Sequence, residues 1–155
     1  MGGTLIAIEG ICGSGKSSLE KYLETELLKA GLPTSRITTR EEKNEHIFLA
    51  ATENYNLSLS SSAHMFFFQV LQAHKVDRAK QLLKMGHIVI VNRWDLSFFV
   101  HTKNFGCLAG ESDFLRKKIS RLAFGDLIPN LGIYLDVSAD NSLDIPIPKQ
   151  NVTFL

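Results

Sequence analysis

The sequence predicts an α/β fold with a mainly parallel sheet and helices on both of its faces. A short apolar run at residues 4–8 is followed by a glycine-rich segment and then by a helical pattern. Strand-like and helical segments continue to alternate along the chain, which favours parallel strands joined by right-handed crossovers. The run H-I-V-I-V at residues 87–91 is apolar throughout, as is typical of a parallel strand covered on both faces.

The first third of the chain predicts a strand–loop–helix–strand unit. We expect a strand at residues 4–8, a helix that begins at Lys16, and a second strand at residues 36–39. Gly31 and Pro33 are expected to end the helix. Its apolar positions recur at spacings of three and four: Leu19, Tyr22, Leu23, Leu27 and Leu28.

The middle of the chain reads as helical. Residues 41–54 form a plausible short helix, and the serines at 60–62 can cap a long helix that runs to Lys84 and is closed by Gly86. A strand at residues 87–91 follows. A further helix is expected at residues 113–123.

The last predicted strand covers residues 131–137. After it, residues 138–155 contain prolines and asparagines without a helical period, so we expect an irregular tail. A length of 155 residues favours a single domain over residues 1–155.

Composition excludes several classes of protein. Hydrophobic residues make up 45% of the chain and charged residues 21%, which is ordinary for a globular domain. A net charge of +1 offers no basic field for a nucleic acid. We predict no signal peptide, no membrane span and a cytoplasmic location. Cys12 and Cys107 have no metal-ligand spacing and are expected to be free thiols.

Residues 10–17 match the pattern G-x-x-x-x-G-K-[ST] of a phosphate-binding loop. Glycines allow the backbone to form a concave nest of N–H groups, and this nest opens onto a helix N-terminus that favours anions. Lys16 is expected to reach the β- and γ-phosphates, and Ser17 to offer its hydroxyl to Mg²⁺. The predicted phosphate-binding residues are Gly10, Ile11, Cys12, Gly13, Ser14, Gly15, Lys16, Ser17 and Ser18.

Four segments together resemble one family. Residues 4–18 read T-L-I-A-I-E-G-I-C-G-S-G-K-S-S, and residues 38–41 read T-T-R-E. Residues 86–97 read G-H-I-V-I-V-N-R-W-D-L-S, and residues 128–137 read I-P-N-L-G-I-Y-L-D-V. In this order they resemble the thymidylate kinase family of P-loop nucleoside monophosphate kinases over residues 4 to about 140.

The resemblance implies transfer of the ATP γ-phosphoryl group to a nucleoside monophosphate, with dTMP as the expected acceptor and Mg²⁺ as the cofactor. Lys16 and Arg93 would be the catalytic residues. Arg40 and Arg93 match positions that hold the acceptor phosphate, where the planar guanidinium fits phosphate oxygens. Ser97 matches a serine that supports this phosphate, although a helix-capping role is an alternative. Asn92 would contact a metal-bound water.

The run M-F-F-F-Q at residues 65–69 falls where the family lines its base pocket. Phe67 is therefore expected to stack on the base and Gln69 to hydrogen-bond its edge. The other two phenylalanines are expected in the core. The family is often dimeric through long helices, so the apolar face of residues 63–83 is a candidate for a homodimer interface or for internal core.

The sequence also departs from the family. Cys12 and Asn92 replace aspartates, Leu71 occupies the place of a base-reading arginine, and His101 and Thr102 replace a Tyr-Gln pair. The family's basic helix, arginine-bearing lid and last strand have no counterpart after residue 137, so the resemblance implies a C-terminal truncation.

Three readings of the function remain open at this stage. The first is a thymidylate-kinase-like enzyme, its activity impaired by the truncation. The second is a degenerate P-loop protein that binds a nucleotide without turnover, which the changes at Cys12 and Asn92 favour. The third is a deoxynucleoside kinase, which Gln69 favours.

Overall fold

Four parallel strands form the centre of the molecule. The computed structural model describes residues 2–38 and 60–138. Within these residues the sheet has the strand order β2-β3-β1-β4, and every neighbouring pair is parallel. The strands are β1 (Thr4–Gly10), β2 (Thr34–Ile37), β3 (Ile88–Asn92) and β4 (Leu131–Leu135). The predicted α/β class with a parallel sheet is confirmed.

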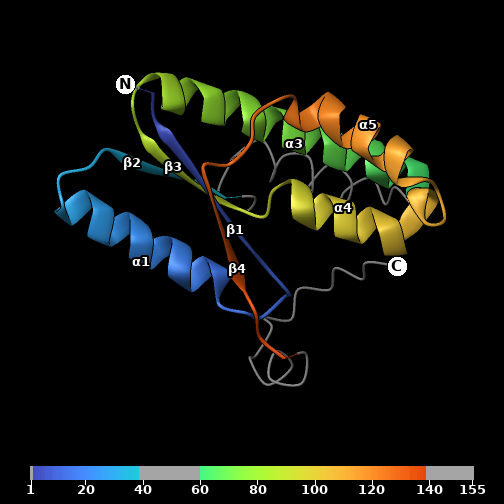
Figure 1. Ribbon diagram of the computed structural model, residues 1–155, viewed down its shortest axis with the longest axis horizontal. Coiled ribbons are helices and arrows are strands. Elements are labelled where there is room, and N and C mark those ends of the chain that lie inside the picture. The colour runs from blue at the N-terminus through green and yellow to red at the C-terminus, as the bar shows by residue number, and fades with distance from the viewer. Residues whose placement is uncertain (1, 39–59, 139–155) are drawn as a thin grey trace, which may run out of the picture.

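Helices cover both faces of this sheet (Figure 1). One face carries α1 (Lys16–Lys29), which contacts β1, β2 and β3. The other face carries α3 (Ser61–Lys84) and α4 (Asp95–Asn104), with α5 (Asp113–Phe124) packed against both of these helices. A short 3₁₀ turn, η1 (Gly106–Leu108), joins α4 to α5.

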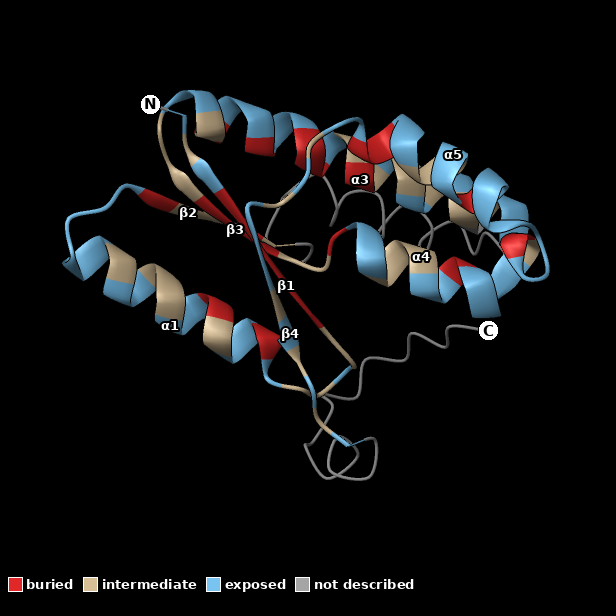
Figure 2. Cartoon of the chain, in the orientation of Figure 1, coloured by how far each residue is buried: buried red, intermediate tan, exposed pale blue. Residues whose placement is uncertain are grey.

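The hydrophobic core lies between the sheet and the α3 side. Successive side chains of a strand point to opposite faces, so alternate residues of β1 and β3 enter this core. Its buried members are Leu5, Ala7, Ile37, Val76, Ala79, Leu82, Val89, Val91, Trp94, Ala123 and Phe124. Ile6, Ile8 and Ile90 are buried on the opposite face, which α1 covers. Figure 2 shows buried residues along β1 and β3, whereas β4 has none.

The element boundaries agree with the predicted order, with small shifts. The second strand begins and ends two residues earlier than expected, and β4 ends at Leu135 instead of residue 137. Ser60 caps α3, as predicted, because its Oγ accepts a hydrogen bond of 3.3 Å from the Ala63 N–H. The helix expected at residues 41–54 and the tail at 139–155 lie outside the described residues.

One helix was missed and one expectation was wrong. The sequence analysis assigned no element to residues 92–112 apart from a possible helix-capping role for Ser97, whereas α4 occupies residues 95–104. We also expected two of the three phenylalanines at 66–68 in the core, yet Phe66 is 65% exposed, Phe68 is 37% exposed and Phe67 is only half-buried. The reason is that α3, at about 36 Å, is roughly twice as long as the five-residue strand β3, so its N-terminal half extends beyond the sheet.

No helix among residues 2–38 and 60–138 is long and apolar enough to cross a membrane. Cys12 and Cys107 are both unpaired, as expected.

Candidate functional site

The predicted phosphate loop lies between the carboxyl end of β1 and the first residue of α1. Gly10, Gly13 and Gly15 have φ values of +146°, +78° and +88°, a backbone region that L-residues with side chains rarely adopt. The loop residues 11–15 therefore turn back on themselves before Lys16 begins the helix. Such a turn directs successive N–H groups toward one point, and the first N–H groups of α1 have no partner within the helix. This geometry suits an anion.

Gly10 is also constrained by its neighbours. A Cβ atom at this position would lie 2.8 Å from the Leu135 carbonyl oxygen and 2.8 Å from Ser14 Oγ. β4 and the loop thus approach Gly10 too closely for any side chain. The first glycine of the motif is required by packing as well as by its φ angle.

Lys16 lies in the floor of the loop and is only 7% exposed. Its ammonium group donates to the Ile11 carbonyl oxygen and, at 3.2 Å, to Ser14 Oγ. Burial lowers the pKa of Lys16, and the nearby charge of Arg93 lowers this pKa further. The amine is therefore held within the loop, where a phosphate would compensate both effects.

Arg93 reaches the same loop from the carboxyl end of β3. Its φ of +64° is the only positive value at a non-glycine position among residues 2–38 and 60–138. Its guanidinium donates to the Gly10 carbonyl oxygen at 3.3 Å, to Ser97 Oγ at 3.3 Å and to Cys12 Sγ at 3.2 Å. A strained backbone that aims a cation at a phosphate loop is a feature of functional sites. The structure thus brings Lys16, Arg93 and Ser97 together, as the sequence predicted.

Glu9 holds Arg93 and α4 in place, and the sequence analysis missed it. Its carboxylate is 6% exposed and accepts hydrogen bonds from the backbone N–H groups of Trp94 at 2.8 Å and Ser97 at 3.3 Å, and from the Ser97 hydroxyl. These N–H groups belong to the first turn of α4, where helices lack internal acceptors and favour negative charge. Glu9 therefore replaces the side-chain cap that Trp94 does not provide.

Asn92, Ser17 and Glu20 form a further group of polar side chains beside the start of α1. The Asn92 amide nitrogen, at the end of β3, lies 3.3 Å from Ser17 Oγ and 3.4 Å from Glu20 Oε2. The sequence predicted that Ser17 and Asn92 would share a metal site, and the structure places them together. Within the part of the chain that the structure describes, no group of three or more His, Cys, Asp or Glu side chains could hold a metal ion.

The expected base-binding residues lie on the N-terminal half of α3. The Gly3 N–H donates to the Leu83 carbonyl oxygen at 2.9 Å, so the C-terminal end of α3 lies at the amino ends of the strands. The half that carries Phe67 and Gln69 consequently extends toward the carboxyl ends, where the loop lies. The Gln69 amide is buried with neither polar atom hydrogen-bonded, and Gln72 Oε1, one turn further on, is likewise unsatisfied.

Such buried, unsatisfied amides are uncommon and suit a polar ligand. Gln72 was not predicted, because a buried glutamine cannot be distinguished from an exposed one by helical spacing alone. Arg40, predicted to bind the acceptor phosphate, lies outside the described residues.

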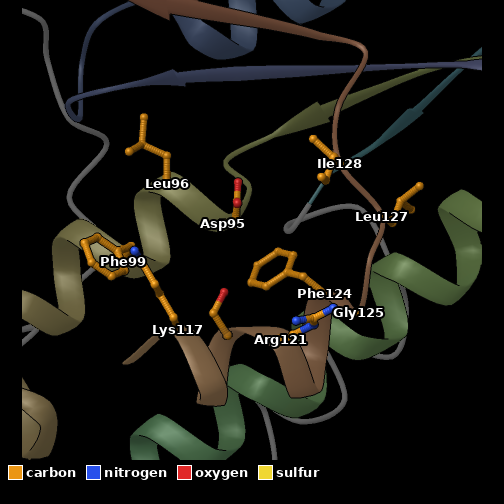
Figure 3. Close-up of a pocket in the computed structure, with 10 residues that line it drawn as sticks. Asp95, Leu96, Phe99, Lys117, Arg121, Phe124, Gly125, Leu127 and Ile128 are labelled. Atoms are coloured by element: carbon orange, nitrogen blue, oxygen red, sulfur yellow. The ribbon is translucent and has the colours of Figure 1, made fainter. Parts of the chain in front are cut away.

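A separate pocket of about 350 Å³ lies between α4 and α5. Figure 3 shows the Phe124 ring between these helices, with Lys117 and Arg121 contributed by α5. None of the lining residues belongs to the phosphate loop or to the predicted acceptor site. This pocket is therefore distinct from the candidate site.

No protein-family model matches the chain. The chain is 31% identical over 143 residues to the thymidylate kinase of Herpetosiphon aurantiacus and 30% identical over 143 residues to that of Chlamydia abortus. Both comparisons cover 89% of this chain. The chain spans 58% of the length of the first relative and 66% of the second.

Solved structures of two thymidylate kinases are similar to this chain in fold. A thymidylate kinase from Ehrlichia chaffeensis superposes with a TM-score of 0.68 at 21% identity, over 92% of this chain and 76% of that one. The Candida albicans thymidylate kinase gives a TM-score of 0.65 at 23% identity, over 92% of this chain and 67% of that one. At these identities the structural likeness establishes a shared fold.

Proposed function

We propose that this chain is a member of the thymidylate kinase family and that it transfers the γ-phosphoryl group of ATP to a nucleoside monophosphate, with dTMP as the acceptor. The products would be ADP and the nucleoside diphosphate. Curated relatives that are thymidylate kinases support the proposal, and so does the arrangement of the site.

The observation that carries the proposal is the position of Arg93. Its guanidinium lies against the Gly10 carbonyl and the Cys12 thiol. The positive charge that follows β3 is therefore in contact with the loop that follows β1. In open parallel sheets, ligands bind at the carboxyl ends of neighbouring strands. A phosphoryl group passing from ATP on the loop to an acceptor beside Arg93 would stay among positive charges throughout. Charge neutralisation and positioning are the main contributions a protein makes to this chemistry.

On the donor side, the loop N–H groups and the Lys16 ammonium would hold the β- and γ-phosphates. The Ser17 hydroxyl is an oxygen ligand of the kind that Mg²⁺ prefers, and it fits a cation that arrives with ATP. The Asn92 amide nitrogen lies 3.3 Å from this hydroxyl. A Mg²⁺ ion held there would supply charge neutralisation at the phosphates. Ser17 would contact the cation directly, and the Asn92 amide, with its oxygen turned toward the cation, would accept a hydrogen bond from one of its waters.

On the acceptor side, Arg93 and Ser97 would orient the monophosphate, together with Arg40. Phe67 would stack on the base, and Gln69 would hydrogen-bond the base edge. Support comes from the buried Gln69 amide, whose polar atoms have no partner in the described residues. Gln72 is added to this group for the same reason.

The test is coupled release of ADP from ATP and Mg²⁺ with dTMP or thymidine as acceptor. Lys16→Ala removes the phosphate-binding amine, and Lys29→Ala is the matched control because Lys29 is exposed at the far end of the same helix. Release that depends on dTMP, persists in Lys29→Ala and disappears in Lys16→Ala would support the proposal. Release with thymidine alone would instead identify a deoxynucleoside kinase.

A second candidate function is nucleotide binding without turnover. The Cys12 thiol and the neutral Asn92 amide favour it, because each stands where the family resemblance leads us to expect a carboxylate. ATP binding by the wild type and loss of binding in Lys16→Ala, without ADP release, would decide for this alternative.

A homodimer and a cytoplasmic location stay predictions. Phe66 and Val70, 65% and 63% exposed and one turn apart on α3, are the apolar side chains we propose for the dimer contact. Sedimentation velocity would test this, since Phe66→Ser should shift a dimer toward monomer. An unchanged sedimentation coefficient would contradict it.

A further inference from the structure

Glu20 is a carboxylate buried beside the phosphate loop, and the proposed function so far gives it no role. It lies on α1, one turn after Lys16, and is 1% exposed. Burying a charge this deeply costs free energy unless cations or hydrogen-bond donors surround it. A carboxylate at this depth therefore needs donors or cations beside it, and the Asn92 amide nitrogen is one such donor.

Asn92, which donates to Glu20, belongs to the proposed metal site. Asn92 Nδ2 lies 3.4 Å from Glu20 Oε2 and 3.3 Å from Ser17 Oγ. Because one nitrogen is close to both oxygens, the hydroxyl and the carboxylate are at most two hydrogen-bond lengths apart. Ser17 and Glu20 come from the same face of α1, three residues apart, and Asn92 approaches them from β3.

These separations match the geometry of a hydrated Mg²⁺ ion. Mg²⁺ binds its ligands at about 2.1 Å in an octahedron and usually retains several waters. A cation on Ser17 Oγ would hold waters at about 2.1 Å, and a group that accepts a hydrogen bond from such a water lies about one hydrogen-bond length beyond the water. A carboxylate at the distance of Glu20 can accept a hydrogen bond from such a water without touching the ion.

We propose that Glu20 supplies the negative charge of the outer metal shell, so that the charge absent at Asn92 is relocated from the end of β3 to the first turns of α1. This inference rests on the proposed function, because it needs a nucleotide-bound cation at Ser17. Asn92 then contributes no charge, and its amide nitrogen orients the Glu20 carboxylate through a hydrogen bond of 3.4 Å. The low effective dielectric around a buried carboxylate strengthens its attraction for the cation.

The test measures the metal directly. Mn²⁺ serves as the probe, and its binding to the chain in the presence of ADP is followed by electron paramagnetic resonance. Glu20→Gln should weaken Mn²⁺ binding by about 10- to 100-fold, the effect typical of removing an outer-shell partner. Glu26→Gln is the matched control, because Glu26 lies on the same helix with an exposed side chain paired to Lys29. This control should bind Mn²⁺ as the wild type does.

A double-mutant cycle keeps the test decisive. If Glu20 provides the charge, Asn92→Asp should restore most of the lost Mn²⁺ affinity in the Glu20→Gln background and change it much less in the wild type. Equal effects of Asn92→Asp in both backgrounds would overturn the inference, and so would unchanged Mn²⁺ binding in Glu20→Gln. If Glu20→Gln fails to fold, Glu20→Asp provides a shorter carboxylate, which should give intermediate affinity.

Failure of this inference is distinguishable from failure of the proposed function. ADP binding measured in EDTA reports on the phosphate loop without the metal. ADP binding retained in EDTA, with Mn²⁺ affinity insensitive to Glu20, would remove the inference and leave the proposed function standing. A wild-type chain that binds no ADP in either condition would contradict both.

Discussion

Replacement of Glu9 should destabilise the fold and displace Arg93 at the same time. Glu9→Leu keeps a side chain of similar size but removes the acceptor of three hydrogen bonds, those from the Trp94 N–H, the Ser97 N–H and the Ser97 hydroxyl. These donors form the first turn of α4, and Trp94 is 2% exposed. Water therefore has little access to at least one of the donors that the substitution leaves without a partner.

The magnitude follows from these contacts. An unsatisfied buried donor costs roughly 1–3 kcal/mol, and a hydrogen bond to a charged group contributes about 1.5–3 kcal/mol. Because the Ser97 hydroxyl can turn toward other acceptors, we count mainly the two backbone donors. We expect Glu9→Leu to lower the free energy of unfolding by roughly 3–5 kcal/mol. Glu9→Gln keeps one acceptor oxygen for Trp94 and should cost about 1–2 kcal/mol.

Urea denaturation followed by circular dichroism measures both values, with Glu26→Gln as an exposed control. Acceptor kinetics then separate positioning from stability. In Glu9→Gln, which stays folded, the KM for dTMP should rise because Arg93 loses its fixed orientation, whereas ATP binding on the loop should persist. A cost below about 1 kcal/mol for Glu9→Leu would refute the reasoning, since a single lost cap costs that much.

Three further predictions follow. Gly10→Ala should abolish nucleotide binding and lower the free energy of unfolding by roughly 2–4 kcal/mol, measured by urea denaturation, because the added Cβ would collide with the Leu135 carbonyl oxygen. Phe124→Ala should cost roughly 3–5 kcal/mol in the same assay, because the 3%-exposed ring packs edge-on against Trp94 at 5.1 Å; a cost below about 1 kcal/mol would contradict its place in the core. For Lys16, the pKa in the folded state is lowered, first by burial and then by Arg93. The unfolded chain therefore binds the proton more strongly, so the penalty is constant below the lowered pKa and is relieved as pH rises from there to the ordinary lysine pKa. The stability of the wild type relative to Lys16→Met should consequently increase across that alkaline window, and a flat difference would contradict the pKa shift.

The sequence predicted the parallel sheet and the phosphate loop well because both depend on local patterns. A strand of continuous apolar residues and a loop with three left-handed glycines are specified by adjacent residues. Arg93 and Ser97 could be identified because they follow a predicted strand at a fixed spacing. Their contacts with Gly10 and Glu9 confirm that they lie at the loop, whereas their roles stay predictions.

The sequence failed where a feature depends on a distant residue. α4 has no side-chain cap of its own, since its first turn is satisfied by Glu9, 85 or more positions earlier in the chain. Its residues D-L-S-F-F-V-H-T-K-N include several that are indifferent helix formers. The start signal that helix prediction relies on is therefore absent from the local sequence. The exposure of Phe66 likewise depends on how far α3 extends past the sheet. No local sequence pattern predicts this distance.

The strained backbone at Arg93 supports a role for this residue in ligand binding. A left-handed conformation at a non-glycine residue costs roughly 1–3 kcal/mol and persists only where its surroundings enforce it. Here the enforcing group is Glu9, whose hydrogen bonds to Trp94 and Ser97 hold the main chain that follows Arg93, while the guanidinium points at the loop. The left-handed residue directs the Arg93 guanidinium to Gly10 and Cys12 of the phosphate loop. Backbone strain of this kind clusters at binding and catalytic sites, so it supports the proposal that Arg93 holds the acceptor phosphate.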